Sequence, residues 1–290
     1  MALTQSNKRD SGVDSLAGFF VIYIAVGHAL NLYHLPNYNM CPSPFLYFFM
    51  PWFFYKGGMY FRHKDDKTAL LQNFKRLIKP FIIWSIAGCL VFNLLSLLFQ
   101  SQMRLPLIWI KEMIADGSIY ENKPLWFLLS LFIVKTISNK FAPPNRKNLL
   151  ILSIIFGLLI ASFGNYWGCH IPLWLFNSSS GLVFFLIGYL VGCKYNWGLF
   201  ILSSIIWLAI SIFIPVGVNM RANETNYGQF YLWWPYSIAG IYTVNFLIKL
   251  VPLGVIESKF NLLRVAGIYS MEIYVIHWIL LLIPIAVGLI

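Results

Sequence analysis

Long apolar stretches separated by short polar segments extend along the whole chain. A transmembrane helix needs about 20 mainly apolar residues, and most of these stretches reach or approach that length. Membrane β-strands would alternate apolar and polar positions, and these stretches do not. We therefore predict an all-α fold with about nine spans, whose approximate limits are residues 15–33, 44–61, 77–99, 124–139, 148–164, 174–193, 197–215, 230–250 and 267–289.

Together the spans predict one polytopic transmembrane helix bundle. The chain shows no internal repeat and no appended soluble domain, so residues 1–290 are expected to form a single membrane domain. The apolar segment 105–113 is too short to cross a bilayer, and it is predicted to be an interfacial or re-entrant helix.

Composition supports the membrane assignment. Charged residues make up 11% of the chain and hydrophobic residues 59%, whereas soluble domains contain about 25% charged residues. The formal net charge of +11 is first a topology signal in a membrane protein, so we do not expect nucleic acid as a partner.

The distribution of Lys and Arg predicts the orientation, because these residues favour the cytoplasmic side. With the N-terminus inside, 16 of the 21 Lys and Arg residues fall in inner segments and 4 in outer segments, while Lys56 lies within the second span. We therefore predict a cytoplasmic N-terminus in the cell (inner or plasma) membrane. Cys41 and Cys169 would then both face outward, where a disulfide bond can form.

Two intramembrane histidines are the first candidates for chemistry. His28 lies toward the outer end of the first span and His277 in the middle of the last, and desolvation makes such residues costly. The alternative for each is a neutral histidine that hydrogen-bonds a neighbouring helix. Asp14 lies about 21 Å along the helix from His28, so the two need separate partners. Glu272 precedes His277 by five residues and is expected on a different face of its helix.

A basic segment stands just before the third span. Lys75, Arg76 and Lys79 precede Pro80 on the predicted cytoplasmic side. On a helical turn Arg76 and Lys79, three residues apart, share a face, and cations there can hold a phosphorylated cofactor. The alternative is that these are positive-inside residues which contact anionic lipid.

Several segments, in order, resemble the acyltransferase-3 family of integral membrane O-acyltransferases. They are Asp14, Leu16, Gly18 and His28 in the first span, residues 50–61, Arg76 to Pro80, residues 124–131, residues 184–192 and residues 267–277. Three features depart from the family pattern. Ala17 stands where the family usually has Arg, and Lys79 stands where it has a second Arg. The family usually continues with one more helix after the segment that contains His277.

This resemblance implies an acyltransferase that uses acyl-CoA, most simply acetyl-CoA, bound from the cytoplasm. The acceptor would be a hydroxyl of a surface glycan or lipid-linked sugar. The implied catalytic candidates are His28, Asp14, Glu121 and His277, with His28 as general base or transient acyl carrier. Lys75, Arg76 and Lys79 would bind the phosphates of coenzyme A, and no metal is expected.

Two other functions remain open at this stage. The chain is alternatively a membrane transporter or flippase, in which His28, His277 and Glu272 form a proton or substrate path. It is alternatively a non-catalytic relative of the family. This alternative is suggested by Ala17 in place of the usual Arg and by the family helix that does not follow the segment containing His277.

Overall fold

The computed structural model describes residues 10–34, 44–101, 103–166, 172–192, 194–214, 230–252, 256–258 and 261–289. Within these ranges every element is a helix and there is no strand, as predicted for an all-α protein. The elements are α1 (Ser11–Leu32), α2 (Phe49–Met59), α3 (Asp66–Asn73), the π-helix η2 (Phe74–Ile78), α4 (Lys79–Gln100), α5 (Pro106–Asp116), the 3-10 helix η3 (Tyr120–Leu125), α6 (Trp126–Tyr166), α7 (Leu173–Val191), α8 (Trp197–Phe213), α9 (Phe230–Leu250), α11 (Leu262–Ile268) and α12 (Ser270–Ala286).

Three helical stretches in the described residues are long and apolar enough to cross a membrane, namely Ser11–Leu32, Asp66–Gln100 and Trp174–Val191. The pair α11 and α12 passes the same test together, although its two helices are bent by 87°. These stretches coincide with the first, third, sixth and last predicted spans. The total of nine spans and the orientation of the N-terminus stay predictions.

Some predicted boundaries differ from the structure. The predicted span 44–61 is longer than the helix found there. Helix α2 has 11 residues and runs from Phe49 to Met59. The predicted spans 124–139 and 148–164 are joined in one continuous helix, α6. The short apolar segment near residue 105 does form a separate short helix, α5, as predicted. Cys41 and Cys169 lie outside the described residues.

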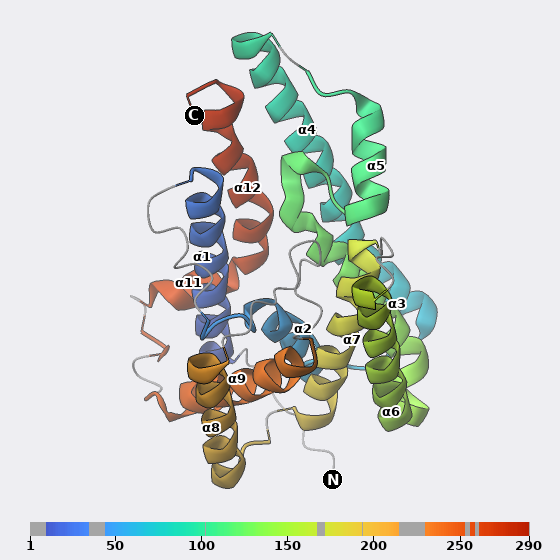
Figure 1. The fold of residues 1–290 in the computed structure, drawn as a ribbon, viewed down its shortest axis with the longest axis vertical. Helices are drawn as coiled ribbons and strands as arrows, with labels where there is room; N and C mark the ends of the chain where they lie inside the picture. The colour runs from blue at the N-terminus through green and yellow to red at the C-terminus, as the bar shows by residue number, and fades with distance from the viewer. Residues whose placement is uncertain are drawn as a thin grey trace.

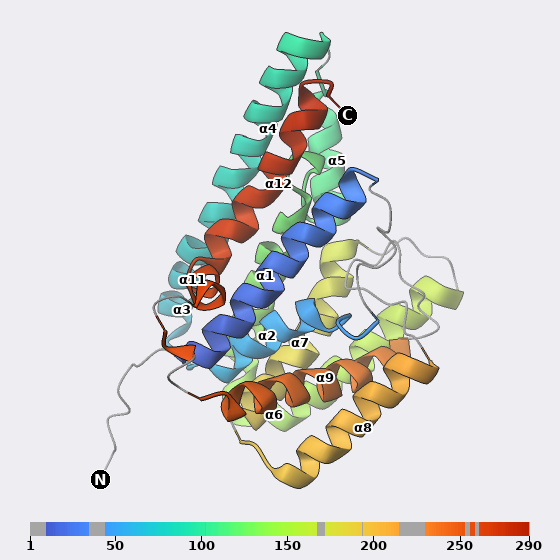
Figure 2. The same ribbon diagram turned by 90° about the vertical axis from the view of Figure 1, so that its left-hand side faces the viewer.

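Helices α1, α4 and α12 rise together on one side of the molecule (Figures 1 and 2). Near the C-terminal ends, the Tyr33 hydroxyl, just beyond α1, donates to the Leu281 carbonyl at 2.8 Å, and the Gln100 amide of α4 donates to the Ile285 carbonyl. The three helices therefore run in the same direction. Their N-terminal ends, including the basic start of α4, lie at the same end of this group.

The last predicted span is broken at Tyr269, where α11 ends and α12 begins. Helix α11 crosses α1 so closely that a Cβ atom on Gly267 would lie 1.7 Å from the Asp14 backbone oxygen. A Cβ atom on Gly18 would likewise lie 1.8 Å from the Leu263 oxygen. Small residues permit such close backbone approach between membrane helices. This crossing fixes the start of α12 against α1.

The remaining helices pack below and beside this group. Helix α2 lies against α7, and α8 lies against α9. Large aromatic residues such as Trp52, Phe184 and Trp233 are completely buried between them. Trp52 also donates its indole N–H to the Asn245 amide oxygen at 3.2 Å, so α2 is tied to α9.

Candidate functional site

His28 and His277 meet between α1 and α12. The Nδ1 atom of His28 lies 2.8 Å from the Nε2 atom of His277, within hydrogen-bond range. His277 is buried and His28 is half-buried. Their rings are nearly parallel, with centroids 5.2 Å apart. The structure therefore joins two residues that sequence reasoning treated separately.

The second hydrogen bond of His277 assigns the protons of the neutral pair. Its Nδ1 atom lies 3.1 Å from the Ile273 carbonyl oxygen, which can only accept, so Nδ1 carries the proton. A neutral imidazole has one donor and one acceptor nitrogen. Nε2 of His277 must then accept from the Nδ1–H of His28. This assignment leaves Nε2 of His28 as its unprotonated, basic nitrogen.

The segment η3 closes against the histidines from the side of α12. The Trp278 ring stands edge-on to His28, with centroids 5.1 Å apart, and its indole N–H donates to the Tyr120 carbonyl at 2.9 Å. The Asn122 amide donates to the Val275 carbonyl at 3.0 Å, and the Tyr274 hydroxyl donates to the Pro124 carbonyl. These bonds fix an aromatic wall beside the pair, which limits the access of water.

Glu121 is completely buried in η3 and belongs to a charged cluster. Arg104 donates to Glu121 at 3.0 Å and to Glu112 at 2.6 Å. Trp109 donates to the same oxygen of Glu121 at 3.1 Å. Burial alone would lower the pKa of Arg104, but its hydrogen bond to Glu112 and the charges of both glutamates raise it. Arg104 therefore stays a cation and pairs with both glutamates.

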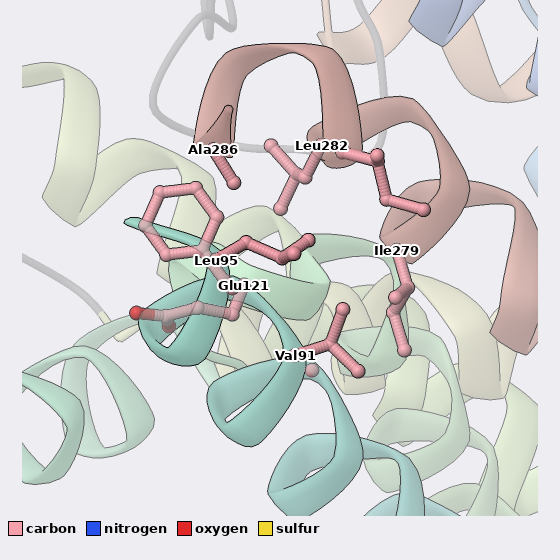
Figure 3. Close-up of a pocket in the computed structure, with 9 residues that line it drawn as sticks. Val91, Leu95, Glu121, Ile279, Leu282 and Ala286 are labelled. Carbon is pink, nitrogen blue, oxygen red and sulfur yellow. The ribbon is translucent and has the colours of Figure 1, made fainter. Parts of the chain in front are cut away.

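A narrow groove lies between α4 and α12 beside Glu121, with essentially no room for a water molecule. Figure 3 shows the Glu121 carboxylate pointing away from Ile279, Leu282 and Ala286, which form the opposite wall. The other side chains that line the groove, apart from Glu121, are also apolar. The groove therefore presents an apolar surface, and the charge of Glu121 is directed toward Arg104.

A second cavity, of about 50 Å³, lies between α1, α2, α6 and α12. It is lined by Val21, Met50, Phe53, Phe127, Ser270, Met271 and Tyr274. Val21 precedes His28 by about two helical turns. The Tyr274 ring lies 6.0 Å from the His277 ring, centroid to centroid. The cavity thus lies on the side of the N-terminal ends of α1 and α12, about two helical turns from His28, and neither histidine lines it.

The predicted basic residues lie where a π-helix meets α4. Lys75 and Arg76 belong to η2 and Lys79 begins α4, and all three are exposed. On an α-helical turn Arg76 and Lys79 would share a face, but η2 is a π-helix with i→i+5 hydrogen bonds. The positive charges of Arg76 and Lys64 both act on Lys135 of α6, so basic side chains from three segments gather here.

The other predicted residues lie apart from the histidine pair. Asp14 is buried in the first turn of α1, and α1 is continuous from there to His28, so the distance expected along the helix holds. Glu272 is exposed whereas His277 is buried, which confirms that they occupy different faces of α12. Ala17, at the position of the usual family Arg, is completely buried.

Sequence reasoning missed Trp278, Tyr274, Arg104 and Asn122 as neighbours of the site. For the histidine pair itself a signal was present. The first and ninth spans of the predicted topology run in the same direction. His28 lies past the midpoint of the first span, and His277 lies near the middle of the ninth. Comparing these depths would have suggested contact. No comparable signal locates Arg104 or Asn122, because both lie in irregular connecting segments.

The fold and the site define a helical membrane protein with two imidazoles paired between α1 and α12. Residues 10–285, nearly the whole chain, match the acyltransferase-3 family, described as an acyltransferase domain. The chain therefore belongs to this family, as its motifs predicted, and is in general terms a membrane acyltransferase. Searches among curated proteins and among solved structures found no match.

Proposed function

We propose that this protein is an O-acyltransferase that moves an acyl group from acyl-CoA to a hydroxyl of a surface glycan or lipid-linked sugar. The hydrogen bond between His28 and His277 is the observation that carries this proposal. It leaves a basic nitrogen on His28, held by a partner ring at an aromatic wall. A base in such a setting is suited to accept a proton from an alcohol.

The reaction proceeds by direct transfer. Nε2 of His28 takes the proton of the acceptor hydroxyl, and the oxygen attacks the thioester carbonyl carbon. The new C–O bond forms, the C–S bond breaks, and the coenzyme A thiolate takes the proton back from Nε2. While His28 is protonated, its Nδ1–H remains hydrogen-bonded to neutral His277, which stabilises the imidazolium.

The position of the basic residues supports entry of the donor from the cytoplasm. Lys75, Arg76 and Lys79 lie at the N-terminal end of α4, which is also the end at which α1 and α12 begin. Phosphate groups of coenzyme A would bind these cations. The thioester would then reach the histidines between the helices, and the acceptor would approach from the other end in the cell membrane.

The transporter alternative has less support. It required His28, His277 and Glu272 to form one path, but Glu272 is exposed on a different face of α12 from His277. Asp14 lies about 21 Å along α1 from His28, and Glu121 forms an ion pair with Arg104. We therefore assign proton transfer to His28, assisted by His277.

Purified protein in detergent or liposomes, with radiolabelled acetyl-CoA and a glycan acceptor, tests the proposal. We expect the wild type to label the glycan and His28→Ala to lose about 10²- to 10⁴-fold in rate, the usual contribution of a general base. Glu272→Gln is a matched control, because this exposed residue of α12 should not alter transfer. Transfer that survives in His28→Ala would reject the catalytic role, and uptake into liposomes without acyl transfer would favour a transporter.

A further inference from the structure

Lys135 is a cation within the helix bundle that no step of the proposed reaction uses. It belongs to α6 and is half-buried, whereas Arg76 of the basic segment is exposed. Removing an ammonium group from water costs free energy unless an opposite charge or hydrogen bonds compensate for the loss. In the described part of the chain the ion pairs involve only Arg104 and Lys249 as cations. Lys135 is therefore partly desolvated without a carboxylate to balance it.

The neighbours of Lys135 along α6 locate its side chain. Leu131, Lys135 and Asn139 follow one another at intervals of four residues, so they lie on one side of the helix. Leu131 is next to α2, because a Cβ atom on Gly57 would lie 3.6 Å from its Cδ1 atom. The Asn139 side chain accepts from the backbone N–H of Lys64 at 3.1 Å and donates to the carbonyl of Lys64 at 3.0 Å. Lys135 thus lies on the side of α6 that faces the segment from Gly57 to Lys64.

Two further cations belong to the segments that pack against this side of α6. Lys64 leads into α3, and Arg76 is part of η2. Both α3 and η2 contact α6, and α3 lies beside it in Figure 1. The positive charges of Arg76 and Lys64 both act on Lys135. Three basic side chains from separate segments are therefore brought to one place.

The carboxylates of this region are engaged elsewhere. Asp66 accepts a hydrogen bond from the Asn139 amide at 2.8 Å, and Asp65 accepts one from the Thr68 backbone at the start of α3. Among the residues that the structure describes, neither forms an ion pair with any of the three cations. Like charges held close together repel one another, and an anion that bound between them would turn this repulsion into attraction.

We propose that Lys135, Arg76 and Lys64 form a phosphate-binding site in which Lys135 sets the affinity. The inference rests on the proposed acyltransferase function, and it identifies which residue holds the phosphorylated end of the donor. A phosphate monoester carries a charge of about −1.5 to −2 at pH 7 and three acceptor oxygens, so it can accept from all three cations. Because Lys135 is half-buried, its attraction for phosphate is screened less than that of the exposed Lys75 and Lys79.

Binding of coenzyme A to the purified protein in phosphatidylcholine nanodiscs, which contain no anionic lipid, tests the proposal. Lys135→Met removes the charge and keeps an unbranched side chain, and it should raise Kd about tenfold or more. Lys135→Arg keeps the charge and should retain most of the affinity. Lys140→Met is the matched control, because Lys140 is exposed on the same helix and five residues further on, which turns it to another face. Equal losses in the two Met variants would overturn the proposal.

Thermal unfolding of the same variants separates a binding role from a structural one. Because Lys135 has no ion-pair partner among the described residues, Lys135→Met without ligand should unfold at the same temperature as the wild type or higher. The rise in midpoint on adding coenzyme A should be smaller than in the wild type. A Lys135→Met protein with a clearly lower midpoint and an unchanged Kd would show a structural residue and overturn the proposal.

An anionic lipid headgroup presents the same phosphate chemistry, so a further arm distinguishes the two sources. If the donor is the ligand, adenosine 3′,5′-bisphosphate should compete with coenzyme A, and Lys135→Met should weaken both. If Lys135→Met instead loses bound phosphatidylglycerol, measured by native mass spectrometry, while its Kd for coenzyme A stays unchanged, the donor assignment is wrong.

The proposed function and this inference fail in different ways. Binding of coenzyme A that depends on Lys135, without acyl transfer to any acceptor, would reject the function and keep the phosphate site. Acyl transfer whose KM for the donor is the same in Lys135→Met and in the wild type would reject the site while the function stands.

Discussion

The Nδ1 atom of His28 and the Nε2 atom of His277 lie 2.8 Å apart, although 249 positions separate them in the sequence. The carbonyl of Ile273 fixes the tautomer of His277, and that tautomer in turn fixes the proton on His28. The arrangement resembles other catalytic bases in one general respect, since a second group orients the base and supports its positive charge.

His277 is expected to be a positioning residue, and its replacement should slow acyl transfer without abolishing it. His277→Ala removes a hydrogen bond that becomes charge-assisted in the transition state. Such bonds contribute about 1.5–3 kcal/mol, so kcat should fall about 10- to 150-fold. His277→Gln, whose amide oxygen can accept from the Nδ1–H of His28, should recover part of the rate. Steady-state kinetics over a range of pH would check this, and equal loss in both variants would argue against hydrogen bonding as the cause.

Arg76 is expected to contribute to donor binding. Arg76→Gln should raise KM for acyl-CoA about fivefold or more, because a charge-assisted contact to phosphate is lost, and the effect should weaken at high salt. Lys67→Gln is the control, since Lys67 is an exposed cation on the neighbouring helix α3. If both variants raise KM equally, the basic segment acts only through its overall charge.

Arg104 should be important for folding, because it neutralises a carboxylate that is completely buried. In Arg104→Gln, Glu121 would lose its 3.0 Å ion pair and keep only the neutral Trp109 donor. Breaking a buried pair costs about 3–5 kcal/mol, so the midpoint of thermal unfolding in detergent should fall clearly. Lys111→Gln, an exposed change on α5, should leave the midpoint unchanged. A similarly small effect in both variants would mean that the ion pair between Arg104 and Glu121 does not stabilise the fold.

The hydrophobic pattern was sufficient to predict the helical class and the positions of the longest spans, including α1 and α4. It did not predict the break at Tyr269 or the short length of α2. Apolar residues continue through both places, so hydropathy alone cannot show where a helix bends. The close crossing of Gly18 and Gly267 depends on two backbones far apart in the chain, and no local pattern reports it.

The free-energy cost of burying a histidine in a membrane singled out His28 and His277, and the structure places these two residues in contact. Their contact could not be derived from each helix alone, because it depends on how α1 and α12 pack. Glu121 was identified as an acidic candidate, but its ion pair with Arg104 comes from the irregular segments around α5. Such connections follow from tertiary packing and leave no periodic signal.

The distance in sequence between the two imidazole rings has a consequence for biosynthesis. The ribosome adds the first ring, that of His28, 249 residues before its partner ring. A nascent chain that has not yet reached His277 and Trp278 therefore holds the first ring without the two side chains that position it in the folded protein.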